Sequence, residues 1–211
     1  MSLNPDRRDL RDDSGFTLME LMMTVTIIGF VIAGLTGIVI SYFKTTVDTQ
    51  ARLTESHDVQ FVAAYWQRDV ASIGVRSFDA GTKTFPLQQS VDVTPACALP
   101  SGTVVATLAW SEYTSLDSTA TPARVTVSYV AQADGTGYDL VRRRCSGATV
   151  DSTVEVAHSL NALPTKTCDV ACTGSGANVP SVVNLNLSVL DPEGNGTTAY
   201  TATLSGERRQ S

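Results

Sequence analysis

The chain has 211 residues, which fits one domain plus an additional segment better than two full domains. Its 15 basic and 21 acidic side chains give a net charge of −6, which argues against a protein whose main partner is nucleic acid. Aromatic residues make up 7%, too few for a surface that stacks single-stranded bases, and His57 and His158 lie too far apart in sequence for a histidine-rich metal centre.

An uncharged apolar segment begins at Leu21 and ends at Phe43. As a helix it would be about 34 Å long, enough to cross a hydrocarbon core of about 30 Å. A secretory signal cleaved after Ala33 is the alternative, but the apolar region of such a signal is usually only about 7–15 residues long. The sequence therefore predicts one membrane-spanning helix near the N-terminus.

Basic residues are more frequent before this segment, where three arginines stand, than just after it, where Lys44 and Arg52 stand. This bias predicts that the N-terminus lies inside the cell and the large C-terminal part outside. All four cysteines follow the segment, and an even number of cysteines in an exported domain indicates disulfides.

Glu20 places a charge at the start of an otherwise uncharged helix. A charge at the centre of a membrane helix costs about 2.5–3.5 kcal/mol, so a carboxylate kept there needs a partner or a function. A cut between Gly15 and Phe16 would create an α-amine four residues before Glu20, in the same or a neighbouring subunit. The alternative is an uncleaved signal anchor, in which the Glu20 side chain merely reaches the polar interface of the membrane.

The stretch Gly-Phe-Thr-Leu-Met-Glu-Leu from Gly15, followed by the apolar segment, resembles the prepilin processing signal of type IV pilins and type II secretion pseudopilins. The resemblance implies that a prepilin peptidase cuts after Gly15 and methylates the new N-terminal Phe16, and that Glu20 acts in assembly with other pilin or pseudopilin subunits. It also implies a place in the cytoplasmic membrane before assembly and in an extracellular or periplasmic filament afterwards.

Two departures from the family pattern bear on peptidase efficiency and on the kind of subunit, respectively. The residues before Gly15 are acidic where the family usually has basic ones, and the apolar segment lacks the proline of many major pilins. The segment Trp66–Gly74 resembles the helix end of PilW- or GspJ-like minor pilins. The missing proline and this resemblance favour a minor pilin or pseudopilin over a major pilin.

The segment 44–74 changes to an amphipathic pattern, with apolar residues at helical spacing. They are Phe61, Val62, Tyr65, Trp66, Val70 and Ile73. No proline interrupts the chain from Phe16 to Ile73, and Gly74 is a plausible helix end. One helix of about 58 residues is expected, with two helices broken near Ser41 as the alternative.

After Gly74, alternating runs rich in threonine and valine predict half-buried antiparallel strands. The runs cover residues 103–110, 123–130, 138–142, 182–190 and 198–204, with a hairpin turn at 133–137. A long helix packed on such a sheet is an α+β, pilin-like fold. The expected parts are a leader (1–15), an assembly half of the helix (16–43), an amphipathic half (44–74) and an extracytoplasmic β-rich domain (75–211).

The four cysteines allow three pairings. A local bridge between Cys168 and Cys172 fits their short loop, and Cys97 would then pair with Cys145. A zinc site is the competing interpretation, but the spacing lacks two C-x-x-C pairs.

No catalytic or nucleotide-binding motif occurs in the chain, so neither an enzyme nor a cofactor is predicted. Residues 191–195 offer oxygen ligands for calcium, but a hairpin turn explains them better. Arg142 and Arg144 are the candidate contacts should the protein bind DNA. The predicted function is a structural filament subunit. The alternative is a membrane-anchored extracellular binding module that never polymerises.

Overall fold

A computed structural model describes residues 15–113, 122–189 and 199–210. Helix α1 runs from Leu18 to Ser72 over 55 residues without a break at Ser41, which confirms the prediction of one long helix. Gly74 follows it with a φ of 148°, and its N–H donates to the carbonyl oxygen of Ala109. Such a φ suits glycine, so Gly74 turns the chain from the helix into the sheet.

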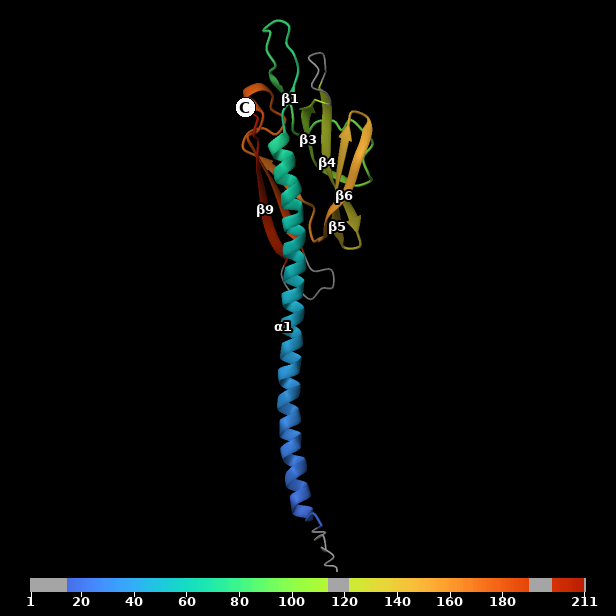
Figure 1. Cartoon of the computed structure of the whole chain (residues 1–211), viewed down its shortest axis with the longest axis vertical. Coiled ribbons are helices and arrows are strands. Elements are labelled where there is room, and N and C mark those ends of the chain that lie inside the picture. The colour runs from blue at the N-terminus through green and yellow to red at the C-terminus, as the bar shows by residue number, and fades with distance from the viewer. Residues whose placement is uncertain (1–14, 114–121, 190–198, 211) are drawn as a thin grey trace, which may run out of the picture. The chain divides into compact units, whose positions relative to one another are not determined.

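The chain forms two structural units that divide between Thr46 and Val47, within α1. The first unit contains the apolar part of α1. The second contains residues 47–72 of α1 and everything that follows, and Figure 1 shows the strands of this unit around that part of the helix.

The second unit contains a seven-stranded antiparallel sheet and a small two-stranded one. The seven-stranded sheet has the order β3-β4-β5-β6-β8-β7, with β9 on the other side of β8. Its strands are β3 (Thr103–Glu112), β4 (Ala123–Asp134), β5 (Gly137–Ser146), β6 (Thr149–Leu160), β7 (Thr165–Cys168), β8 (Val182–Val189) and β9 (Tyr200–Glu207). The small sheet pairs β1 (Val75–Arg76) with β2 (Leu87–Gln88), and a 3-10 turn covers Gly176–Asn178.

Each of the five predicted runs corresponds to a strand, and the fold is the expected α+β, pilin-like arrangement. The hairpin turn is also confirmed, because Asp134 pairs with Gly137 and Gly135 has the positive φ that such a turn needs. Sequence reasoning missed β6 altogether. Its pairing with β5 contains register shifts that interrupt the alternation of buried and exposed residues.

The core lies between the second half of α1 and the sheet. Val62, Trp66, Val70 and Ile73 are fully buried against it, as their helical spacing predicts. Phe61 is different, since it remains 40% exposed. The helix and β9 approach closely at Gly206, where any side chain would collide with Val70.

Candidate functional site

The first described residues form the start of α1. The Oγ1 atom of Thr17 accepts a hydrogen bond of 3.2 Å from the backbone N–H of Glu20, and the N–H of Leu21 donates to the Thr17 carbonyl oxygen at 3.1 Å. Thr17 is therefore the N-cap of α1, and Glu20 stands three residues later, at the spacing of a capping box. Sequence reasoning missed this cap, although the Thr-x-x-Glu spacing carries its signal.

Gly15 is not required by the described fold. A Cβ atom at this position would meet no atom of the described residues within 4 Å, its chain neighbour aside. Packing among the described residues therefore does not require glycine at this position. The side chain of Phe16 beside it is 82% exposed and has no packing role in the single chain.

The Glu20 carboxylate occupies the N-terminal turn of α1, where the helix dipole favours a negative charge. Among residues 15–113, 122–189 and 199–210, no side chain forms an ion pair with it. The helix dipole and the cap explain why an acidic residue is favourable at this position. They do not offset the free-energy cost of moving its charge into an apolar environment. A positively charged partner for Glu20 would have to come from outside the described residues.

The first half of α1 presents apolar side chains to solvent on every side in the single chain. Its most apolar stretch has a mean hydropathy of 2.3 and none of it is buried, so α1 is long and apolar enough to cross a membrane. Thr24, Thr26 and Thr36 donate their hydroxyl hydrogens to the carbonyl oxygens four residues earlier. Because these polar groups are satisfied within the helix, the surface suits lipid or neighbouring apolar helices.

A buried ionic cluster joins the end of α1 to the sheet. The carboxylate of Asp69 accepts hydrogen bonds from Arg142 Nε at 2.6 Å, Arg142 Nη2 at 2.7 Å and the Tyr129 hydroxyl at 2.7 Å. Burial, reinforced by the charge of Asp69, raises the pKa of Tyr129 well above its usual range. Burial works against the charge of Arg142, but its hydrogen bonds and attraction to Asp69 still raise its pKa.

Arg142, one of the two candidate DNA contacts, lies in this buried ionic cluster. Its side chain is only 3% exposed and is held by Asp69, so it has no access to a phosphate backbone. Arg144 is partly exposed but forms ion pairs with Glu112 and Asp151. Arg143 points elsewhere and donates to the carbonyl oxygen of Ala98. The three consecutive arginines therefore form no shared basic surface.

The cysteines form two disulfides in the structure. Cys97 pairs with Cys145, which links the loop before β3 to β5, and Cys168 pairs with Cys172 at the end of β7. All four sulfur atoms are thus engaged in bonds to one another. The calcium alternative falls on residues 191–195, which lie outside the described residues.

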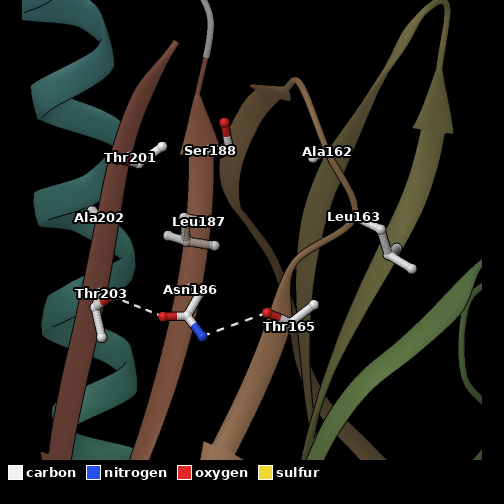
Figure 2. A pocket seen from close by; sticks show the side chains of 9 residues that line it. All are labelled: Ala162, Leu163, Thr165, Asn186, Leu187, Ser188, Thr201, Ala202 and Thr203. Atoms are coloured by element: carbon white, nitrogen blue, oxygen red, sulfur yellow. Dashed lines mark hydrogen bonds between the residues drawn. The ribbon is translucent and has the colours of Figure 1, made fainter.

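An open groove of about 340 Å³ lies on the face of β7, β8 and β9 that points away from the core (Figure 2). Asn186 stands at its centre and hydrogen-bonds with Thr203 on one side and Thr165 on the other, as Figure 2 shows. Its lining consists of hydroxyl, amide and small apolar groups without a charged side chain. Such a lining holds no nucleophile–base pair and no acid–base pair for catalysis.

The family comparison identifies one motif in the chain. The model of the prokaryotic N-terminal methylation motif matches residues 10–36, a stretch that includes Gly15, Phe16 and Glu20. None of the curated proteins and none of the solved structures compared with the chain matches it. The motif match lies on an apolar helix that is followed by an antiparallel sheet, an arrangement that supports similarity to the type IV pilin-like family.

Proposed function

We propose that this protein is a minor pilin or pseudopilin, cut after Gly15, methylated on the new N-terminal Phe16, and assembled into a type IV pilus-like filament through α1. The observation that carries the proposal is the apolar first half of α1, which is exposed on all sides and begins within the methylation motif. Such a surface is stable in lipid, or packed against the same helix of neighbouring subunits in a filament.

Glu20 has the central role in assembly under this proposal. Its carboxylate lacks a positive partner among the described residues, and the α-amine that a cut after Gly15 would create supplies one. An amine of the neighbouring subunit would neutralise the Glu20 charge inside the apolar core of a filament, where an unpaired charge is costly. This pairing would set the axial step between subunits.

The assignment to a PilW- or GspJ-like subunit rests on the helix end. Trp66 and Asp69, the bulky and acidic positions of the resembling segment, both fasten α1 to the sheet. Trp66 Nε1 donates to the Val183 carbonyl oxygen at 3.1 Å, and Asp69 accepts from Arg142 and Tyr129. The two residues thus have one structural task, which is to fix the globular part to the helix.

Incorporation into filaments tests the proposal. The chain is expressed in cells with a prepilin peptidase and a type IV filament machinery, and sheared filaments are probed for it. Glu20→Gln is expected to be processed normally but to be absent from the filaments. Asp48→Asn removes the same charge from an exposed position of the same helix and serves as the matched control, with normal incorporation. Equal incorporation of Glu20→Gln and Asp48→Asn would refute the role of Glu20.

A further inference from the structure

Three metal-ligating side chains meet on the outer surface of the β5–β6 hairpin, away from the processing motif. They are Asp139 on β5 and Glu155 and His158 on β6, and their ligand atoms all lie within 4.8 Å of one another. His158 Nδ1 and Glu155 Oε1 are 2.6 Å apart, and Asp139 Oδ1 accepts a hydrogen bond of 3.2 Å from the backbone N–H of Ser159. The three side chains therefore surround one small space.

Irregular strand pairing creates this cluster. Glu155 and His158 are three residues apart, so a regular strand would place them on opposite faces. The register shifts between Ala157 and Glu155, which makes Val156 an extra residue, and Val156 and Ala157 are both buried. A second shift makes His158 and Ser159 together oppose Asp139, and Ser159 has a φ of 52°. Bulges of this kind re-aim side chains, and here they bring Glu155 and His158 to the same face.

The charge of the cluster is not balanced by basic side chains. In the part of the chain that the structure describes, arginines form ion pairs with Asp69, Glu112 and Asp151, and a lysine pairs with Asp92. None joins a lysine or an arginine to Asp139 or Glu155. A third carboxylate, that of Asp58 on α1, accepts a hydrogen bond of 3.1 Å from the backbone N–H of His158. The cluster thus contains two carboxylates, and a third carboxylate, that of Asp58, lies beside it.

We infer that Asp139, Glu155 and His158 bind a divalent transition-metal ion of the Zn²⁺ type. One imidazole and two carboxylates are a donor set that suits Zn²⁺, with a water molecule in the remaining position. The imidazole makes the set less suitable for Ca²⁺ or Mg²⁺, which prefer oxygen ligands.

The position of the site indicates what the ion does. It would cross-link β5 to β6 where their pairing is irregular, and its ligand His158 is held by its backbone N–H to Asp58 of α1. Because an ion that binds only the folded chain stabilises it, Zn²⁺ would hold this part of the sheet and its contact with α1 in place. The sequence distance between His57 and His158 excludes a histidine-rich centre, but this donor set needs only one of them.

Zn²⁺ binding by the full chain in detergent micelles tests the inference. After treatment with EDTA, the affinity for Zn²⁺ is measured by competition with a chromophoric chelator, together with the melting temperature with and without Zn²⁺. His158→Gln is expected to weaken Zn²⁺ binding at least about tenfold, since even partners of metal ligands are worth about 10–100-fold. Glu155→Gln and Asp139→Asn are expected to have a similar effect.

His57→Gln is the matched control, because it removes the other histidine of the chain from an exposed position that is outside the cluster. Its Zn²⁺ affinity should equal that of the wild type, and its melting temperature should still rise with Zn²⁺. The His158 side chain is 60% exposed, so the metal-free His158→Gln variant should melt like the wild type. The inference is wrong if His158→Gln binds Zn²⁺ as well as the wild type, or if His57→Gln loses as much affinity. It is also wrong if Ca²⁺ binds as tightly as Zn²⁺ and does not require His158.

Discussion

Replacing Asp69 by asparagine should destabilise the globular unit strongly while changing almost no volume. Asp69 neutralises Arg142, whose side chain is 3% exposed, and it accepts three charge-assisted or buried hydrogen bonds of 2.6–2.7 Å. The substitution leaves the guanidinium buried without a counter-ion. Breaking a buried pair by removing one partner costs about 3–5 kcal/mol, and this is the loss we expect in the free energy of unfolding.

Urea unfolding of the full chain in micelles, followed by tryptophan fluorescence, measures this loss. Trp66 reports on the region because its ring packs edge-on against Tyr129 at a centroid distance of 5.1 Å. Arg143→Gln is the control on the same strand. The half-buried side chain of Arg143 donates to the Ala98 carbonyl oxygen and the Thr153 hydroxyl, and the substitution should cost about 1 kcal/mol or less. An Asp69→Asn loss no larger than that of Arg143→Gln would refute the reasoning.

Two further predictions concern pH and the disulfides. Because the pKa of Tyr129 is raised in the folded state, its stabilising contribution is complete below pH 10.0, the ordinary tyrosine pKa, and is lost as pH rises toward the folded value. The stability of the wild type should fall in that range by about 1.4 kcal/mol per pH unit more than that of Tyr129→Phe, and equal slopes in pH-dependent urea unfolding would contradict this. The Cys97–Cys145 bridge spans 48 residues and the Cys168–Cys172 bridge only 4. Removing the first by paired serine substitutions should cost about 4 kcal/mol in thermal unfolding and removing the second about 2 kcal/mol, and the reverse order would argue against chain entropy as the cause.

The features that sequence predicted are those with a local signal. The apolar segment, the helical spacing of Val62, Trp66 and Val70, and the strand alternation are each visible within a short window. The same is true of the hairpin turn at Gly135, where two short segments face each other. For these elements the local pattern and the tertiary packing agree.

The features that sequence missed depend on pairing between distant segments. Asp69 and Arg142 are 73 residues apart, and only the register of β5 beneath α1 brings them together. A run of arginines ordinarily lies in solvent, so the burial of Arg142 also depends on this long-range pairing. The cluster around His158 depends on bulges in β6, which have no simple sequence pattern. The Thr17 cap is different, because its spacing was present in the sequence and was overlooked.

The intact mass and N-terminal sequence of the chain, after co-expression with a prepilin peptidase, test the central claim most directly. The account predicts a chain that begins at Phe16 and carries one additional methyl group on its N-terminal nitrogen. Gly15→Leu should block this processing without destabilising the chain, because the described fold has open space at that position. A wild-type chain that keeps the residues up to Gly15 in the presence of active peptidase would contradict the account. The apolar helix would then be a permanent anchor, and the protein an extracellular binding module that does not polymerise.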